Sequence, residues 1–239
     1  MTRILVTRPE PGASETARRL TALGHEPAVL PLTETRALHI ANSPDAAQFD
    51  AVVATSSAAL RHAPAGLVES FSGLPLYAVG EKTAEAASRA GFRTIRAGGG
   101  NADALADHIS GAVPRDSRLL YLCGRLRTGA LAGRLEQAGF AVKVLEVYDT
   151  TAVEHARDAA VGVLSGRPVD VALVYSAYGA AMLSQVAERP ELEPLFHATR
   201  FLCISARAAD ALSPEILARV QIAGTPDEAG LFRLLGAPG

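Results

Sequence analysis

The chain has 239 residues, of which 49% are hydrophobic and 20% are charged, with a formal net charge of −2. This is enough apolar sequence for one large core or two small ones, and the lack of a basic block argues against nucleic-acid binding. No apolar run has the length of a signal peptide core or a membrane span, so we expect a cytoplasmic protein without a membrane partner. The six histidines show no metal-ligand spacing, and Cys123 and Cys203 each end an apolar run, which predicts buried free thiols and no metal.

Short apolar runs alternate with alanine-rich amphipathic stretches along the chain, which predicts an α/β fold with mainly parallel sheets covered on both faces. The apolar runs predict strands at 3–7, 27–32, 51–54, 76–79, 93–96, 118–122, 142–148, 170–175, 201–204 and 219–222. The amphipathic stretches predict helices at 12–23, 56–63, 81–90, 101–109, 127–138, 154–164, 177–187, 206–211, 214–218 and 227–235. Helix caps are expected at Ser14 and at Asn101 or Asp103, and helix ends at the glycines Gly24, Gly91 and Gly139.

The same architectural unit occurs twice in the sequence. Residues 3–35 and 118–150 each run from an apolar strand through a basic loop and an amphipathic helix to a glycine turn and a second strand. The likeness continues further along, where 51–60 resembles 172–181, 78–87 resembles 203–212 and 97–105 resembles 223–231. The duplication predicts two similar α/β domains that face each other, with a ligand between them.

Two extended segments, 28–37 and 142–151, occupy equivalent places in the two copies. Each continues past the point where a compact domain would turn back, so we expect two strands that cross between the domains as a paired β-ladder. One domain is then inserted, at 38–145, and the other is discontinuous, comprising 1–34 and 150–239. The repeats alone would equally allow two consecutive domains.

Four predicted strand ends open into a helix through small or hydroxylated residues. Ligands of open α/β sheets bind at the carboxyl ends of the strands, and the unpaired N–H groups of a helix's first turn attract anions. Simple N-capping is the alternative for any single turn, but four turns at matching positions favour a ligand rich in carboxylates or phosphates. The turns contain Thr55, Ser56 and Ser57; Gly80, Lys82 and Thr83; Ser176, Ala177 and Tyr178; and Ser205 and Arg207.

Further candidate ligand contacts lie at other strand ends. Gly100 and Asn101 form a backbone-exposing turn that matches neither a phosphate-binding loop nor a dinucleotide fingerprint. Thr7 and Arg8 end the first strand. Arg8, like Arg125 and Arg127 after the matching strand of the second copy, is suited to bidentate carboxylate binding, with a solvated surface position as the alternative.

Tyr148, in the second crossing strand, is the candidate proton or hydrogen-bond donor, with ordinary edge-strand packing as the alternative. The sequence has no nucleophile-elbow, zinc-protease or spaced Cys/His pattern. In an enzyme of this kind the substrate would carry most of the reactivity, and the protein would contribute orientation and charge stabilisation.

Several segments, individually short, carry a family resemblance through their order and spacing. They are ILVTRPEP at 4–11, VVATSSAAL at 52–60, YAVGEKTAEAASRAGF at 77–92, GGGNADALADHI at 98–109, VYDT at 147–150, VALVYSAYGAAML at 171–183 and, most weakly, CISARAADAL at 203–212. Through them the chain resembles the uroporphyrinogen-III synthase family over nearly its full length. The resemblance implies two α/β domains joined by a two-stranded ladder.

The resemblance also implies a reaction. The family's substrate, hydroxymethylbilane, would bind between the domains, lose water, and close with inversion of ring D to uroporphyrinogen III, a step of tetrapyrrole biosynthesis that leads toward heme. No metal or organic cofactor is implied. The four acetate and four propionate groups of this substrate suit helix N-termini. We expect a monomer with this small molecule as its partner.

Matching motifs place the family's site residues on this chain. Its hydroxyl contacts fall on Thr55, Ser56, Thr83 and Ser176, and the tyrosine that assists loss of the hydroxyl falls on Tyr148. This chain departs from many relatives at one turn, which reads Ser-Ala-Arg-Ala at 205–208 in place of a Gly-Pro-Thr-Thr-like sequence.

At the departing turn, Ser205 or Arg207 would have to replace the threonine contacts. Two other functions stay open at this point: a non-catalytic tetrapyrrole-binding or sensory module of the same fold, and a two-lobed binding protein for another anionic metabolite. Retention of Tyr148 and of the hydroxyl turns favours the enzyme.

Overall fold

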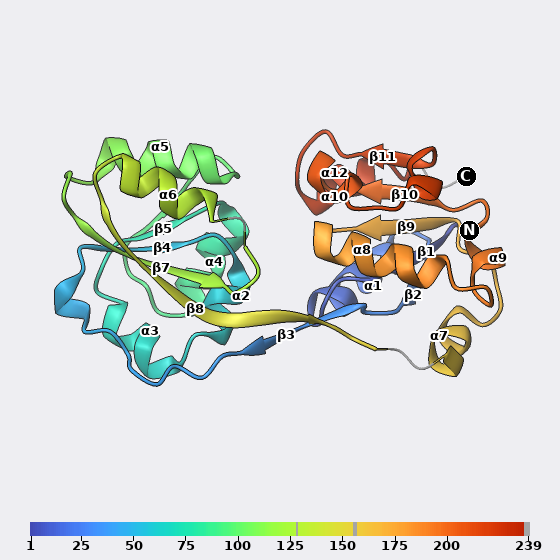
Figure 1. The fold of residues 1–239 in the computed structure, drawn as a ribbon, viewed down its shortest axis with the longest axis horizontal. Coiled ribbons are helices and arrows are strands. Elements are labelled where there is room, and N and C mark those ends of the chain that lie inside the picture. Colours follow the sequence, from blue (N-terminus) through green and yellow to red (C-terminus); the bar gives the residue numbers. More distant parts are fainter. Residues whose placement is uncertain (128, 155–156, 237–239) are drawn as a thin grey trace. The chain divides into compact units, whose positions relative to one another are not determined.

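The computed structural model describes residues 1–127, 129–154 and 157–236, which form two compact units (Figure 1). Unit 1 comprises Met1–Glu34 and Thr151–Gly239, and unit 2 comprises Thr35–Thr150. Positions 128, 155–156 and 237–239 lie outside the described residues. They fall in the predicted helix at 127–138, in the predicted helix at 154–164 and at the predicted end of the discontinuous domain, respectively. Among the described helices, none is both long and apolar enough to cross a membrane.

Unit 1 is built on a five-stranded parallel sheet with the order β11-β10-β9-β1-β2. Its strands are β1 (Arg3–Val6), β2 (Glu26–Val29), β9 (Val171–Val174), β10 (Arg200–Cys203) and β11 (Val220–Ile222). One face packs against α1 (Gly12–Ala22) and α12 (Glu228–Arg233). The other packs against α7 (Arg157–Leu164), α8 (Ala177–Ala187), α9 (Glu193–Phe196), α10 (Ala206–Ala209) and α11 (Pro214–Leu217).

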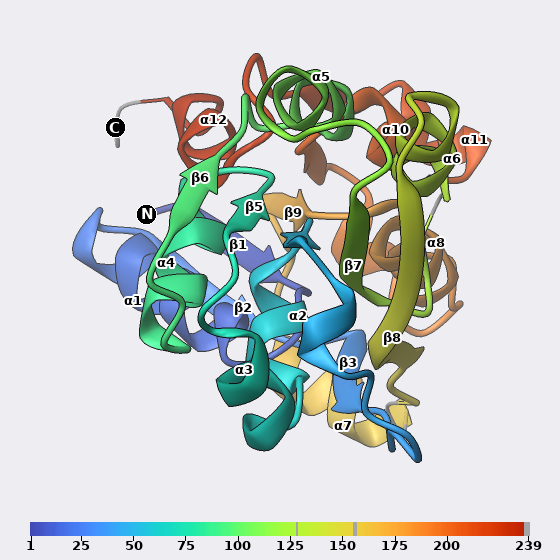
Figure 2. The ribbon, with the colours of Figure 1, turned by 90° about the vertical axis from the view of Figure 1, so that its left-hand side faces the viewer.

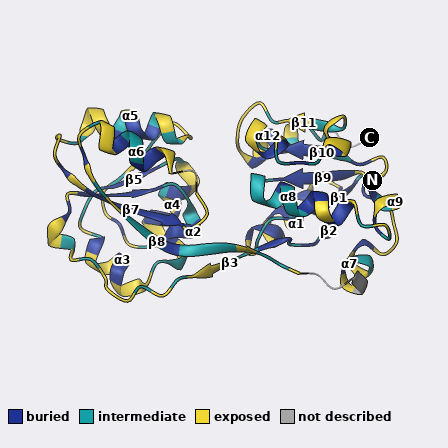
Figure 3. Ribbon diagram, viewed as in Figure 1, coloured by how far each residue is buried: buried dark blue, intermediate teal, exposed yellow. Residues whose placement is uncertain are grey.

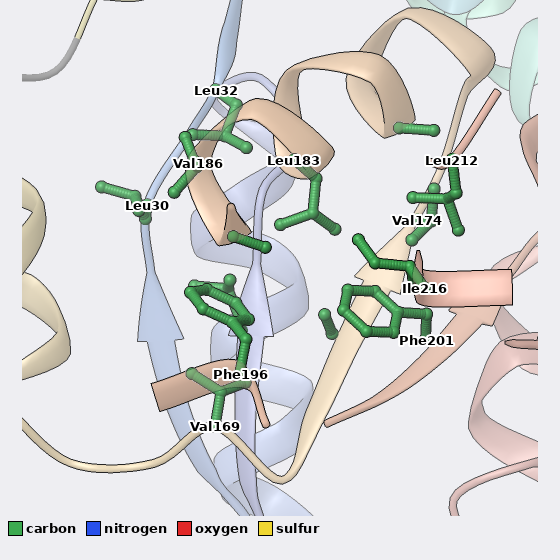
Figure 4. Packing of buried hydrophobic residues seen from close by; sticks show 14 of the residues in the cluster. Leu30, Leu32, Val169, Val174, Leu183, Val186, Phe196, Phe201, Leu212 and Ile216 are labelled. Carbon is green, nitrogen blue, oxygen red and sulfur yellow. The ribbon is translucent and has the colours of Figure 1, made fainter. Parts of the chain in front are cut away.

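The central strands of unit 1 are apolar throughout because helices cover both of their faces. Every residue of β1 and β9 is buried (Figure 3). Figure 4 shows the larger core cluster, in which Val186 of α8 lies beside Leu32, Leu183 of the same helix lies in the middle of the cluster, and Phe201 of β10 packs beside Ile216. Continuous rather than alternating hydrophobicity is what parallel strands covered on both faces require.

Unit 2 contains the sheet β3-β8-β7-β4-β5-β6, in which the pairings from β8 to β6 are all parallel. Its strands are β3 (Thr33–Ala37), β4 (Ala51–Ala54), β5 (Leu76–Ala78), β6 (Ile95–Ala97), β7 (Arg118–Gly124) and β8 (Ala141–Ala152). The helices α2 (Ser57–His62), α3 (Ala65–Phe71) and α4 (Glu81–Arg89) pack on one face, and α5 (Ala102–Ala112) and α6 (Ala130–Gln137) on the other (Figure 2). A short 3-10 turn, Ala46–Gln48, precedes β4.

The extended segment 28–37 contains two strands rather than one. β2 ends at Val29 and β3 begins at Thr33. Pro31 has no N–H to give to a ladder, while the N–H groups of Leu30 and Leu32 donate to Val6 and Thr7 at the end of β1. Between β2 and β3 the chain therefore stays hydrogen-bonded to the end of β1 through Leu30 and Leu32. β3 then lies beside β8 at the edge of the second sheet, and the ladder joining the two units stays a prediction.

The helix starts agree with the sequence in part. The cap expected at Ser14 is wrong, because α1 begins at Gly12 and the Ser14 hydroxyl donates to the carboxylate of Glu10 instead. The cap at Asn101 is confirmed, since its side-chain oxygen accepts from the Ala104 N–H at 2.8 Å. The helices α3 and α9 are absent from the prediction, because α3 has only seven residues and contains Gly66, and α9 has only four residues.

The sheet orders show how the sequence repeat is distributed. The order β6-β5-β4-β7-β8 in unit 2 repeats the order β11-β10-β9-β1-β2 in unit 1, with the first strand pair of each sequence copy at β1-β2 and β7-β8. Gly24 and Gly139, which are equivalent in the repeat, both adopt positive φ just after their helices. Each sheet therefore combines the first strand pair of one sequence copy with the last three strands of the other.

Candidate functional site

The predicted turns lie at the carboxyl ends of parallel strands within each unit. In unit 2 they follow β4, β5 and β6, and in unit 1 they follow β1, β9 and β10. Because neighbouring parallel strands end at the same edge, each sheet gathers its turns along one edge, where open α/β sheets bind ligands. Unit 2 gathers Thr55, Ser56, Ser57, Gly80, Lys82, Thr83, Gly100 and Asn101, and unit 1 gathers Thr7, Arg8, Ser176, Ala177, Tyr178, Ser205 and Arg207.

Three serines in these turns are helix N-caps. The hydroxyl oxygen of Ser56 accepts from the Ala58 N–H at 3.1 Å, and that of Ser176 accepts from the Gly179 N–H at 3.0 Å. Ser205 does the same for α10. N-capping, the alternative explanation of these residues, is therefore observed, although a capping hydroxyl keeps its own proton for a further acceptor.

The helices that follow the turns differ in length, and this length indicates how strongly each turn can attract an anion. The helices α5 and α8 each have 11 residues and α4 has 9, whereas α2 has 6 and α10 has 4. The helix macrodipole grows from aligned peptide units, so the longer helices present the stronger positive end. The four turns expected from the sequence are thus unequal, because those before α4 and α8 are stronger candidates than those before α2 and α10. The separate turn at Gly100 and Asn101 before α5 joins the stronger group.

The turns before α4 and α5 pack backbone against backbone. A Cβ at Gly80 would lie 3.7 Å from the Cα of Gly100, and the Gly100 N–H donates to the Val79 carbonyl at 2.8 Å. Gly100 has a φ of +87°, which favours glycine. Behind this double turn the Thr83 side chain is buried, while Lys82 is exposed to solvent. Two glycines therefore leave the main chain of this edge open to close approach.

Thr55 is held by a tyrosine that the sequence reasoning missed. The hydroxyl groups of Thr55 and Tyr121 lie 2.9 Å apart, and Tyr121 is buried within β7. Burial raises the pKa of Tyr121, against a smaller opposing contribution from the Thr55 hydrogen bond, so the phenol stays neutral. The available signal was a single tyrosine within the aliphatic strand RLLYLCG.

Tyr148 lies half-buried in β8, opposite Gly124 at the end of β7. Its ring centroid is 5.8 Å from that of His62, whose Nε2 is 3.0 Å from the Thr35 hydroxyl. Burial, together with the positive charge of Arg61, lowers the pKa of His62, so this imidazole is neutral at pH 7. His62 and Gly124 carried no sequence signal, because neither contact is local.

The loop after β7 is tied to β8 by ion pairs. Arg125 lies 3.2 Å from Glu146 and 3.3 Å from Asp149, and Arg127 lies 2.6 Å from Glu146. The hydrogen bond from Arg127 lowers the pKa of Glu146. The two arginines considered as ligands for a substrate carboxylate are thus bound to carboxylates of the protein itself.

Arg8 belongs to a polar cluster of unit 1 centred on the buried side chain of Glu228. The Glu228 carboxylate accepts from Tyr175 at 2.9 Å and from Arg8 at 3.2 Å, and also from Thr16 and Arg19. The guanidinium of Arg8 lies 4.5 Å above the centre of the Tyr175 ring. We name these five residues the Glu228 cluster. It fixes Arg8 between β1, α1 and α12, and no sequence motif indicated it.

The remaining candidate residues either make ordinary hydrogen bonds within the protein or lie in the first turn of a helix. The Thr7 hydroxyl is buried and donates to the Leu173 carbonyl at 3.3 Å, and the Ser57 hydroxyl accepts from Arg61 at 2.8 Å. Arg207 is exposed at the start of α10. Ala177 and Tyr178 lie in the first turn of α8, next to the Ser176 cap.

Comparisons with known proteins give one family and one fold. A family model described as uroporphyrinogen-III synthase HemD matches residues 14–233. The crystal structure of uroporphyrinogen-III synthetase from Helicobacter pylori 26695 superposes with a TM-score of 0.68 at 17% identity, covering 98% of this chain and 97% of that one. A mutant uroporphyrinogen III synthase from the extremely thermophilic bacterium Thermus thermophilus gives a TM-score of 0.57 at 17% identity, covering 98% and 97%. At these identities the solved structures establish a shared fold.

Proposed function

Because the chain belongs to the uroporphyrinogen-III synthase HemD family, we infer that it is a cyclising lyase of tetrapyrrole biosynthesis. The single observation that carries this inference is the family match over residues 14–233, which includes parts of both units. The resemblance read from the sequence is thereby confirmed. The reaction is the loss of water from hydroxymethylbilane and its closure, with inversion of ring D, to uroporphyrinogen III. The match favours this enzyme over a non-catalytic module of the same fold.

Backbone donors rather than arginines are proposed to hold the substrate's carboxylates. Arg8, Arg125 and Arg127 are each bound to a carboxylate of the protein, which reduces the charge they can offer to a ligand. The starts of α4, α5 and α8 offer N–H groups and the positive end of a helix, which suit acetate and propionate groups. We assign Gly80, Gly100 and Ser176 to these contacts.

Tyr148 is proposed to donate to the departing hydroxyl of the substrate. Loss of hydroxide leaves a resonance-stabilised cation on the pyrrole chain, and a donor at the leaving oxygen lowers the barrier because it neutralises the charge that develops there. The position of Tyr148 opposite the end of β7, half-buried and beside a neutral imidazole, supports this role.

The product isomer is the test of this function. Hydroxymethylbilane closes spontaneously without inversion to the symmetric type I isomer, so purified protein is expected to give a clear excess of type III. Freshly generated bilane is incubated with and without protein, and the oxidised isomers are separated by chromatography. Type I alone, from bilane shown to be active with a proven synthase, would contradict the proposal.

Ser176 offers a way to separate helix capping from substrate binding. Glycine is tolerated at N-caps with a loss of only a few tenths of a kcal/mol, so Ser176→Gly is expected to keep the stability of unit 1. If its hydroxyl binds a substrate carboxylate, KM rises by about tenfold, the value of one charge-assisted hydrogen bond. Asp45→Gly is the matched control, because Asp45 caps the 3-10 turn at the amino end of β4 and should leave KM unchanged. An unchanged KM in Ser176→Gly would restrict this serine to capping.

Three further expectations accompany this function. We propose that the protein acts as a monomer in the cytoplasm and binds no nucleic acid. The near-neutral charge supports the last point. Sedimentation at working concentration is the measurement that would reveal a dimer.

A further inference from the structure

The direction of Tyr148 depends on a one-residue register shift in β8. Arg118 to Cys123 of β7 pair in step with Ala141 to Glu146, but Gly124 pairs with Tyr148, so Val147 is the extra residue of β8. Such a shift has the geometry of a β-bulge, which re-aims the side chains that follow it.

The packing of β8 shows the effect of this shift. Val142 and Val144 pack against the cluster under α5 and α6, whereas Leu145 and Val147 pack against the cluster under α2 to α4. Strict alternation would return Tyr148 to the side of Val144. Tyr148 instead packs on the same side as Val147, its immediate neighbour. The register shift therefore turns the phenol toward the face of the sheet that α2 covers.

Gly124 leaves the space into which the phenol fits. A Cβ at this position would lie 2.6 Å from Cζ of Tyr148 and 2.9 Å from its hydroxyl oxygen, whereas ordinary contacts begin at 3.4 Å. The hydroxyl end of the ring thus rests directly on the main chain of β7. Any larger residue at 124 would push this end of the ring away by nearly an ångström.

His62 contacts the same ring from α2. The two rings are inclined by 31° with centroids 5.8 Å apart, which is within the separation of favourable aromatic pairs. The imidazole is itself held through its Nε2, which is 3.0 Å from the hydroxyl of Thr35 in β3. The tyrosine ring is therefore constrained both by a main-chain surface on β7 and by a tethered ring on α2.

We propose that Gly124 and His62 are positioning residues that hold the Tyr148 hydroxyl in its reactive place. The inference rests on the proposed role of Tyr148 as donor to the leaving hydroxyl. Neither residue needs to touch the substrate, because each acts on the ring of Tyr148. A misplacement of about 1 Å in a reacting group costs on the order of 100-fold in rate, which sets the scale of the expected effect.

The test combines kinetics with a direct view of Tyr148. Gly124→Ala and His62→Ala are each expected to lower kcat by about 10- to 100-fold with little change in KM. In protein labelled with ¹³C at tyrosine Cζ, both substitutions should shift the Tyr148 resonance, which is assigned among the five tyrosines by its absence in Tyr148→Phe. His62→Phe keeps an aromatic ring and should restore most of kcat. Gly133→Ala is the matched control, since a Cβ at Gly133 meets nothing within 4 Å.

A double substitution decides whether the effect passes through Tyr148. Gly124→Ala should lower kcat further by less than about twofold when Tyr148 is already phenylalanine, because coupled residues are not additive. An equal loss in both backgrounds, or an unmoved Tyr148 resonance in both single variants, would overturn the inference. Loss of kcat in Tyr148→Phe without loss in Gly124→Ala would overturn it while leaving the role of Tyr148 intact. Full kcat in Tyr148→Phe would overturn that role and the inference together.

Discussion

Replacing Tyr148 by phenylalanine is expected to lower kcat by a factor of about 10²–10⁴, the usual contribution of a positioned proton donor. The substitution removes one oxygen and keeps the ring that packs on Gly124 and beside His62, so the fold and KM should change little. Single-turnover measurement of type III product formation, alongside substrate binding, separates the chemical step from binding. Tyr77→Phe is the matched control, because Tyr77 is buried against His108 on the α5 side of the sheet.

The pattern of kinetic constants decides the role of Tyr148. Equal losses in kcat and kcat/KM assign its hydroxyl to an interaction made in the transition state, whereas a raised KM with unchanged kcat assigns it to uniform substrate binding. Wild-type kinetics in Tyr148→Phe would remove it from the mechanism. A variant that loses rate and also favours the type I product would add control of ring closure to the role of this residue.

Glu228→Ala is expected to lower the free energy of unfolding of unit 1 by roughly 3 kcal/mol. The Glu228 side chain is only 5% exposed and binds the hydroxyls of Thr16 and Tyr175, which would lose their buried acceptor. The arginines left without a partner are 30% and 50% exposed, so water can hydrate them, and the loss falls short of that for a fully buried ion pair. Denaturant unfolding is the measurement. Glu15→Ala, on the exposed face of α1, should stay within about 0.5 kcal/mol of wild type.

The same carboxylate predicts a pH dependence. Burial alone would raise the pKa of Glu228, but hydrogen bonds from Thr16 and Tyr175 and the charges of Arg19 and Arg8 lower it overall. A lowered pKa in the folded state adds stability above the unfolded value of about 4.3 and loses it as the pH falls further. The stability difference between wild type and Glu228→Gln should therefore be largest near pH 7 and shrink below about pH 4. A difference that is constant over this range would contradict the charged state of the cluster.

Sequence patterns predicted those features that depend on residues close together in the sequence. Strand β4 and helix α8 lie where periodicity placed them, and Asn101 caps α5, because local hydrophobic spacing and cap chemistry specify these elements. The helix α3 escaped prediction because it has only seven residues, follows Pro64 and contains Gly66. Tertiary packing of Leu67, Val68 and Phe71 stabilises this helix despite its weak local preference.

In the candidate site too, sequence patterns predicted the features that depend on nearby residues and missed those that depend on tertiary contacts. Serines at strand ends could be placed in turns from sequence, since small polar residues before a helix have a local purpose. The partners of Tyr148 could not, because alternation along β8 predicts the opposite face and only the register shift reverses it. Glu228 gave no signal either, since Thr16 is 212 positions away from it and four donors from other parts of the chain converge on its carboxylate.

The division of the sequence repeat between two sheets governs the order in which the chain can fold during synthesis. By residue 150 every strand of unit 2 except the end of β8 has been made, and this unit contains no strand from later in the described chain. Strands β1 and β2 leave the ribosome first, yet β9, the central partner of β1, follows only after residue 170. The edge of β1 that pairs with β9 therefore stays unpaired while a later part of the chain, unit 2, folds. Chains that stop short of β9 should hence carry a folded unit 2 and an aggregation-prone N-terminus.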